Sequence, residues 1–410
     1  MLTKDNILVH LLGITFLLFP IAHFKISVLG LPFYLAEIPL LTVTGIIFWK
    51  AWKEEWEWKE TIQENKVFFI GVDVFLIGAV LSYAMNEHTL TGLGMLKSFF
   101  FLPTLFAFLM IVRVKTREDG ERILWLWLAG LAMMAWTSLI LIFHGGLTYD
   151  LRLAGGYASP NYLAMLVAPG ALLSMYFFLT TTKTVVKKGS SFFFCITLLV
   201  LLLTQSYVSF AALLGAMMFF LWINRCVLSW PWKKILVLGI LSLLFLLAFL
   251  FSAEKFQTLV SWDERSSLTS RFMIWEAAGK IAKDTFPLGI GPGNFQEKYL
   301  AYQKYFPLYL EWAVPQPHNL YLSLLLQAGT LGLVGFLFLL ISLLKRVRQV
   351  WHEKSLAPEQ QAYGALLISL LLFYLLVGLF DTPYFKNDLA FALWGVIGLM
   401  FAWVREKVRD

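Results

Sequence analysis

Charged side chains are scarce in this chain. They make up 14% of its 410 residues, whereas hydrophobic residues make up 59%. Soluble domains carry roughly 25% charged residues, and a water-soluble fold of this size has no way to hide so much apolar surface. The scarcity of charge therefore excludes an ordinary soluble domain and indicates that a lipid bilayer surrounds much of the chain.

Cysteine is also rare, since only Cys195 and Cys226 occur, both in or beside apolar runs. The long polar loop described below contains none, which excludes a disulfide framework there. The apolar stretch after Lys4 lacks a clear small-residue cleavage site, so we expect it to remain as a signal anchor. The sequence shows no internal repeat and no separate soluble domain.

Long apolar runs are what the chain has in abundance. A spanning helix needs roughly 20 mostly apolar residues, and we predict an all-α, polytopic membrane bundle of about 12 transmembrane helices. The predicted spans are 7–22, 33–49, 67–85, 92–112, 123–144, 161–181, 191–205, 207–223, 235–252, 318–343, 363–380 and 389–404. The uncharged stretch 192–223 is too long to cross the bilayer once, so we divide it into two short helices that turn near Gln205 and Ser206.

The formal net charge of +7 fits either nucleic acid or an anionic membrane surface as a partner. The basic residues cluster between apolar runs, which favours topology signals over a nucleic-acid patch, and we expect no nucleic-acid partner. Outer segments other than the long loop carry only Lys25, Arg152 and Lys386 when the N-terminus is cytoplasmic. We therefore expect both termini in the cytoplasm and the long loop outside.

This topology divides the chain into three regions. Residues 1–252 form an N-terminal transmembrane region of about nine spans, and 253–316 form the outer loop with short helices. Residues 317–410 form a C-terminal transmembrane region of about three spans.

The outer loop carries three motifs. They read Ser-Arg-Phe-Met-Ile-Trp at 270–275, Pro-Leu-Gly-Ile-Gly-Pro-Gly-Asn-Phe at 287–295 and Pro-His-Asn-Leu-Tyr-Leu at 317–322. Thr269 or Ser270 is a suitable N-cap and would place Arg271 in the first turn of a short helix. A cation at the N-terminal end of a helix is unfavourable, because the helix dipole prefers an anion there. The arginine is reasonable if a bound anion supplies the negative charge.

The other two motifs allow two interpretations each. The glycine run that includes Gly291 and Gly293 lets backbone N–H groups approach a ligand, although a simple turn is the better explanation of the run taken alone. His318 opens a spanning helix at the membrane boundary. It is either an interfacial residue or an acid–base catalyst, a role that suits histidine in general because the unperturbed imidazole pKa is ~6.5.

Two cations elsewhere are predicted near the outer edge of the bilayer. Arg152 precedes the span at 161–181, close to Asn161, and is either functional or a snorkelling surface arginine. Lys97 lies about one turn inside the fourth span, where a charge is expensive and is a functional candidate by default. Glu37 is a weaker candidate that can pair with a basic residue inside the bundle.

The three motifs, together with Arg-Leu-Ala-Gly-Gly-Tyr-Ala-Ser-Pro-Asn at 152–161, resemble the O-antigen ligase and polymerase family of bacterial membrane glycosyltransferases. The core of the resemblance covers residues 269–335. It implies transfer or polymerisation of glycan from an undecaprenyl-diphosphate-linked donor to a glycan or lipid-glycan acceptor. It also implies action at the outer face of the bacterial cytoplasmic (inner) membrane, in cell-surface polysaccharide biosynthesis, with no metal or cofactor.

The resemblance places the family's loop arginine on Arg271 and its histidine on His318, the two residues expected to be catalytic. The residues expected to bind substrate are Arg152, Lys97, Asn161, Gly291, Gly293, Asn294 and Asn319. Family members typically carry another arginine at a hairpin near mid-chain, where this chain has Tyr207. Either Arg152 or Lys97 substitutes for it, or this chain is divergent or handles its donor differently.

Two other classes of function stay open. A lipid-linked oligosaccharide transporter or flippase also has many spans, but it favours internal repeats, and one dominant outer loop suits an enzyme better. The outer loops show no Asp-x-Asp motif of a nucleotide-sugar enzyme, and no paired intramembrane carboxylates of a proton relay stand out. A non-catalytic assembly partner stays possible because the hairpin arginine is absent.

Overall fold

The computed structural model describes residues 4–21, 24–28, 30–53, 58–87, 89–225, 233–234, 237, 239–241, 267–305, 314–353 and 356–409. The predicted all-α membrane bundle is confirmed in these ranges, where regular structure is almost entirely helical. The exception is one antiparallel hairpin, in which β1 (Lys25–Val28) pairs with β2 (Leu31–Tyr34).

The first half of the chain forms most of the bundle. Its helices are α1 (Lys4–Leu17), α2 (Glu37–Lys53), α3 (Trp58–Glu64), α4 (Lys66–Ala84), α5 (Leu90–Met95), the π-helical segment η2 (Leu96–Phe101), α6 (Leu102–Arg113), α7 (Arg117–Leu141), α8 (Pro160–Val167), α9 (Pro169–Thr180), α10 (Thr184–Thr204) and α11 (Tyr207–Ile223). Later come α14 (Ser267–Asp284), α15 (Phe295–Tyr302), α16 (Leu320–Glu353), α17 (Pro358–Val377) and α18 (Asn387–Arg409).

Eight helical stretches of the described chain are long and apolar enough to cross a membrane, and three shorter apolar helices accompany them. Each of these coincides with one of the predicted spans. The span predicted at 235–252 lies almost entirely outside the described residues, so the count of twelve stays a prediction.

The division of the long uncharged stretch is confirmed. α10 ends at Thr204 and α11 begins at Tyr207, and Gln205 between them has the left-handed φ of 50°. The chain thus turns between the two helices at the residues where the sequence predicted a turn. The hairpin therefore brings Tyr207 to the same end of the bundle as Thr204.

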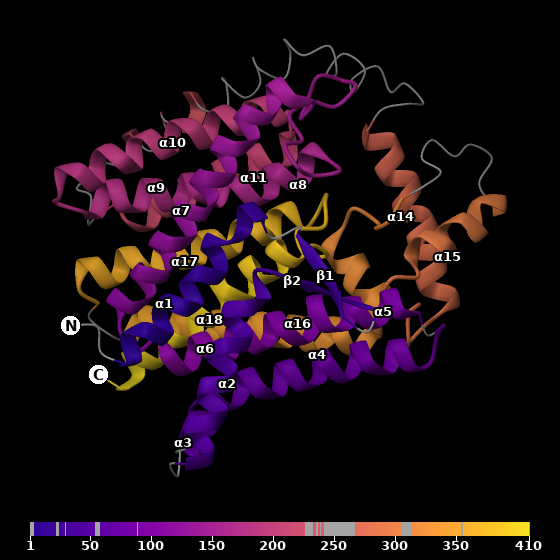
Figure 1. Cartoon of the computed structure of the whole chain (residues 1–410), viewed down its shortest axis with the longest axis horizontal. Coiled ribbons are helices and arrows are strands. Elements are labelled where there is room, and N and C mark those ends of the chain that lie inside the picture. The colour runs from indigo at the N-terminus through magenta and orange to yellow at the C-terminus, as the bar shows by residue number, and fades with distance from the viewer. Residues whose placement is uncertain are drawn as a thin grey trace.

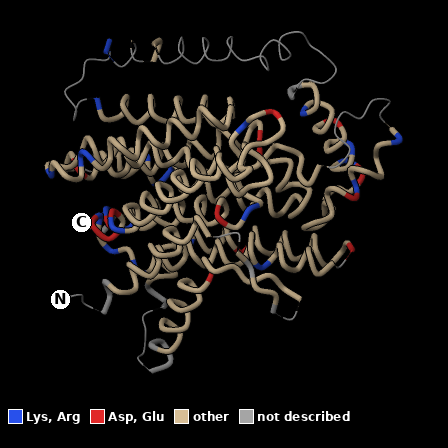
Figure 2. Tube along the Cα trace, turned by 45° about the horizontal axis from the view of Figure 1, so that its top comes forward, with Lys and Arg blue, Asp and Glu red and all other residues tan. Residues whose placement is uncertain are grey.

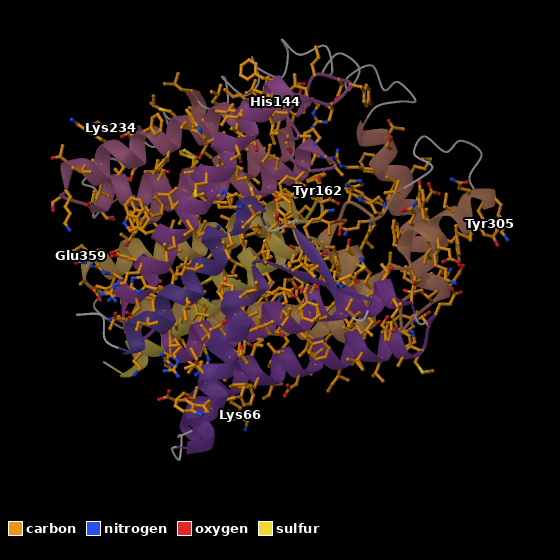
Figure 3. The ribbon with its side chains drawn as sticks, viewed as in Figure 1. Lys66, His144, Tyr162, Lys234, Tyr305 and Glu359 are labelled. Carbon is orange, nitrogen blue, oxygen red and sulfur yellow. The ribbon has the colours of Figure 1, made fainter. Side chains whose placement is uncertain are left out.

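Most helices run along one direction, and the two termini lie together at one end, opposite α14 and α15 (Figure 1). Charged positions gather mainly near the two ends and are sparse along the middle (Figure 2). Glu359 and Tyr305 mark these opposite ends in the side-chain view (Figure 3). This arrangement agrees with termini on one side of a membrane and the outer-loop helices on the other.

Glycine permits a close helix contact between α4 and α16. A Cβ atom on Gly78 would lie 2.2 Å from the backbone nitrogen of Gly332, and one on Gly335 would lie 2.4 Å from that of Phe75. Small residues allow such approach in membrane bundles, where van der Waals packing drives association. The close packing fixes α16, which begins just after the site residue His318 described below, against α4.

The outer-loop helix α14 differs from expectation at its start. It already includes Ser267, so neither Thr269 nor Ser270 is its N-cap, and Arg271 lies beyond the first turn. The sequence prediction was wrong because Ser and Thr are also tolerated inside helices when tertiary packing favours it. Ser270 is indeed buried.

Candidate functional site

Asp381 connects three segments that are far apart in the sequence. It lies in the loop between α17 and α18, and 4% of its surface is exposed. Its Oδ1 lies 3.1 Å from Nδ1 of His318, and its Oδ2 lies 3.8 Å from Nη2 of Arg271. The Nδ2 amide of Asn161 also donates to Oδ2, at 3.1 Å. One buried carboxylate thus holds the arginine and the histidine that the sequence singled out.

The loop that carries Asp381 is fastened to the segment around His318. The backbone N–H of Thr382 donates to Oδ1 of Asp381 at 2.9 Å, and the Thr382 hydroxyl lies 3.2 Å from that of Ser323. The N–H of Leu320 donates to the carbonyl of Gly378 at 2.8 Å. These bonds fix both sides of the His318–Asp381 contact, which favours a preorganised site.

His318 occupies a strained position just before α16. Its φ is 48°, in the left-handed region that residues other than glycine visit uncommonly. The indole N–H of Trp275 donates to the His318 carbonyl at 3.3 Å, and the Trp275 ring packs 5.9 Å from the Phe380 ring. The side chain of His318 is 32% exposed, against 5% for Asp381, so the histidine is the accessible member of the pair. Backbone strain of this kind is concentrated at functional sites.

Asp381 stays ionised despite its burial. Burial by itself raises the pKa of this carboxyl, but contact with His318 and Arg271 and the Thr382 N–H outweighs it and holds the pKa below its ordinary value. An anionic acceptor beside Nδ1 favours the tautomer that carries its proton on Nδ1. The other ring nitrogen, Nε2, then keeps its lone pair and is able to accept a proton.

Arg152 extends the same network. Its Nη2 donates to Oδ1 of Asn161 at 2.8 Å, so Asn161 bridges Arg152 to Asp381. Its Nε donates to the carbonyl of Thr204 at 2.9 Å, and its Nη1 lies 3.8 Å from Asp150. Burial lowers the pKa of Arg152, partly offset by Asp150, but a guanidinium stays charged in proteins. The site therefore contains two guanidinium groups.

The position of Arg152 bears on the arginine missing at Tyr207. Thr204 is the last residue of α10, so the bond to its carbonyl places Arg152 at the turn between α10 and α11. Arg152 lies near enough to interact electrostatically with both Tyr207 and Arg271. Its guanidinium thus stands at the hairpin where the family resemblance led us to expect an arginine.

Lys97 makes its contacts elsewhere. Its ammonium lies 2.8 Å from Oε2 of buried Glu37, donates to the Pro32 carbonyl and sits 4.1 Å from the centre of the Phe33 ring. The predicted pairing of Glu37 with a basic residue is confirmed. Lys97 fastens β2 to the bundle, so of the two proposed substitutes Arg152 is the one that joins the Asp381 network.

The glycine run packs against the end of α4. Gly291 has a φ of 79°, and its N–H donates to the Ser82 hydroxyl at 3.0 Å. Gly293 also has a positive φ, and Nδ2 of Asn294 donates to the Ile290 carbonyl at 2.8 Å. These contacts fit the interpretation of the run as a tight turn. The structure does not bring its polar groups to Asp381 within the described part of the chain.

Asn319 acts as a cap. Its Oδ1 accepts from the N–H of Leu322 at 2.9 Å at the start of α16, and its Nδ2 donates to the Leu379 carbonyl at 2.9 Å. Both ends of the amide therefore hold the site together.

Sequence reasoning missed Asp381. Its position at the outer end of the predicted span 363–380 was the available signal, because an acid there is close to the predicted outer cations. Pairing it with His318 required the tertiary structure.

A buried carboxylate thus contacts a histidine and an arginine at the loop end of this helical membrane bundle. A family model described as "O-Antigen ligase" matches residues 190–337, a stretch that includes Arg271, His318 and the α10–α11 turn. The resemblance to the O-antigen ligase family is thereby confirmed over this part of the chain. No curated protein matches the chain.

Proposed function

We propose that this protein transfers or polymerises glycan from an undecaprenyl-diphosphate-linked donor at the outer face of the bacterial cytoplasmic membrane. The observation that carries the proposal is the contact of Asp381 with both His318 and Arg271, which sets a proton acceptor beside an anion-binding cation. The family match supports the reaction class.

The reaction is a displacement at the anomeric carbon of the donor sugar. The acceptor hydroxyl oxygen forms a bond to this carbon, while the bond from the carbon to the diphosphate oxygen breaks and its electron pair leaves with the diphosphate. His318 takes the hydroxyl proton at Nε2, with Asp381 holding Nδ1–H and stabilising the resulting imidazolium. Asp381 is a positioning residue in this scheme.

Two arginines stabilise the leaving diphosphate. Arg271 and Arg152 provide guanidinium groups that bind phosphate oxygens in pairs, and charge that develops on the leaving group strengthens these contacts in the transition state. Arg152 takes the role of the arginine absent at Tyr207. Asn161, Asn319, Asn294 and the glycine turn hold the surrounding segments, and Lys97 holds the hairpin.

The topology suits a lipid-linked donor. We assign residues 1–252 and 317–410 to the membrane and 253–316 to the outer side, with both termini cytoplasmic. The cluster then lies at the outer edge of the bilayer, where the headgroup of a membrane-anchored diphosphate is found. Helices α14 and α15 at the end opposite the termini agree with this assignment (Figure 1).

The test is transfer by purified protein in lipid vesicles, with a radiolabelled polyprenyl-diphosphate glycan as donor. We expect release of the polyprenyl diphosphate in step with a longer or newly linked glycan. A transporter instead moves the intact donor across the bilayer, and a non-catalytic assembly partner leaves it unchanged. Either outcome, in protein that is correctly folded and supplied with acceptor, contradicts the proposal.

A further inference from the structure

A second candidate site lies beside the hairpin, apart from the Asp381 network. A cavity of about 370 Å³ opens between the β1–β2 hairpin and the segment formed by α5 and η2. These elements lie next to one another in the bundle (Figure 1). The volume falls in the range of roughly 300–1,000 Å³ that is typical of small-molecule sites.

The lining combines hydroxyl groups with aromatic rings. Ser27, Tyr34 and Thr91 are lining residues with hydroxyls, Tyr34 and Phe99 have rings, and Leu90 and Met95 are aliphatic. A groove for a lipid chain needs only apolar lining, whereas a sugar offers both hydroxyls for hydrogen bonds and C–H faces that pack on rings. This mixture of groups favours a carbohydrate over an acyl or prenyl chain.

The floor of the cavity is built on a buried ion pair. The Ser98 hydroxyl donates to Oε1 of Glu37 at 3.4 Å, and Oε2 of Glu37 holds Lys97. Lys97 in turn binds the carbonyl of Pro32, another lining residue. The π-helical segment η2 supplies Ser98 and Phe99, and such irregular turns occur frequently at functional sites. The Lys97–Glu37 pair thus contacts two lining residues, Pro32 and Ser98.

The cavity adjoins the loop that carries Asp381. The Phe99 ring packs 5.9 Å from the Phe385 ring, and the Tyr384 hydroxyl donates to the Phe99 carbonyl. The Gln316 amide, two residues before His318, donates to the Phe385 carbonyl at 3.3 Å. One aromatic layer therefore separates the cavity wall from the segments that hold the proposed catalytic pair.

We propose that this cavity binds a sugar unit of a glycan substrate, at a distance from the sugar that reacts. The inference rests on the proposed function for its substrate class. The predicted topology supports it, because the hairpin between the first two spans lies on the same outer side as the 253–316 loop. The glycan can belong to the donor or to the acceptor, and kinetics distinguish these sources.

Direct binding is the first test. The probe is a soluble oligosaccharide of a few repeat units, released from the host cell's own surface polysaccharide, titrated into protein in nanodiscs by calorimetry. Thr91→Phe places a bulky ring in the cavity lining, and Leu93→Phe places the same ring on α5 at a residue outside the lining. We expect wild type and Leu93→Phe to bind alike and Thr91→Phe to bind at least about tenfold more weakly. Equal binding by all three, or none by wild type, overturns the inference.

Tyr34→Phe is a second test that should leave the fold intact, because it keeps the ring and removes only one hydroxyl. We expect about a three- to tenfold loss of affinity from the missing hydrogen bond. In transfer assays the KM for the donor or for the acceptor should rise in Thr91→Phe while kcat is unchanged, and the KM that rises identifies the source of the glycan. Unchanged KM values for both overturn the inference but leave the proposed function intact. If wild type binds the oligosaccharide but shows no transfer, the cavity inference is supported and the proposed function is contradicted.

Discussion

Nδ1 of His318 lies 3.1 Å from Oδ1 of Asp381, across 63 residues of sequence. The contact joins the start of α16 to the loop between α17 and α18. Because Asp381 is buried and anionic, it orients the imidazole and leaves the more exposed ring nitrogen for chemistry. The first two predictions concern the two members of this pair.

Replacing His318 should reduce turnover. We expect His318→Ala and His318→Gln to lower kcat by about 10²–10⁴ while donor affinity changes little, because a general base acts in the transition state. The measurement is transfer rate and donor affinity, determined separately across pH. Turnover within a few-fold of wild type in both variants, or a loss confined to donor affinity, means that His318 is not the base.

Replacing Asp381 by asparagine should lower both activity and stability at neutral pH. The pKa of Asp381 is depressed in the folded protein, so the stability it contributes is present above its ordinary pKa and is lost as pH falls through the depressed value. We expect Asp381→Asn to cost about 1–3 kcal/mol at pH 7 and to lower Tm accordingly.

The depressed pKa of Asp381 also predicts how the stability difference between wild type and Asp381→Asn varies with pH. The Tm gap between wild type and Asp381→Asn should persist at pH 5–7 and narrow only as pH approaches and passes below ~3.9, the ordinary aspartate value. Thermal unfolding in detergent at several pH values measures it. A gap that is already closed at pH 5 contradicts the ionised state assigned to Asp381.

Replacing Arg271 should weaken binding of the donor diphosphate. A charge-assisted contact contributes about 1.5–3 kcal/mol, which corresponds to a roughly tenfold or greater loss of affinity in Arg271→Ala. Arg271→Lys keeps the charge but loses the paired N–H donors, so we expect it to be impaired as well. Normal transfer in both variants, at equal expression, excludes the role.

Arg152 should matter more than Lys97 for the donor. We expect Arg152→Ala to weaken donor binding and the second change Tyr207→Arg to restore part of it, because both side chains approach the turn after Thr204. Lys97→Ala is the comparison for the diphosphate contact alone: it breaks the Glu37 pair and should lower Tm, while affinity for a polyprenyl diphosphate that carries no glycan is largely retained. An equal loss of affinity in Lys97→Ala would favour Lys97 as the substitute.

The topology predicts which engineered thiols are accessible. In a background without Cys195 and Cys226, we place single cysteines at Val185, Tyr305 and Glu359, all exposed in the structure. An impermeant thiol reagent added to intact cells should label position 305 and spare 185 and 359. Labelling of position 185 or 359 from outside, or no labelling at 305, contradicts the proposed topology.

The sequence alone determined the class of fold and most of the helices. Apolar runs and clustered basic residues are local signals, because each spanning helix satisfies its own backbone hydrogen bonds in lipid. The turn at Gln205 followed from the same physics, since helix length is limited by bilayer thickness. Arg271 and His318 came from motifs, and they lie within hydrogen-bonding or ion-pair distance of one carboxylate.

Only the tertiary structure decided which of the predicted site residues meet. Lys97 and Arg152 are both cations near predicted helix ends, yet Lys97 pairs with Glu37 and Arg152 joins Asp381 through Asn161. Asp381 itself gave no motif. Such contacts join residues from different helices, and the packing of those helices depends on side-chain shape across the whole bundle, which no local pattern in the sequence encodes.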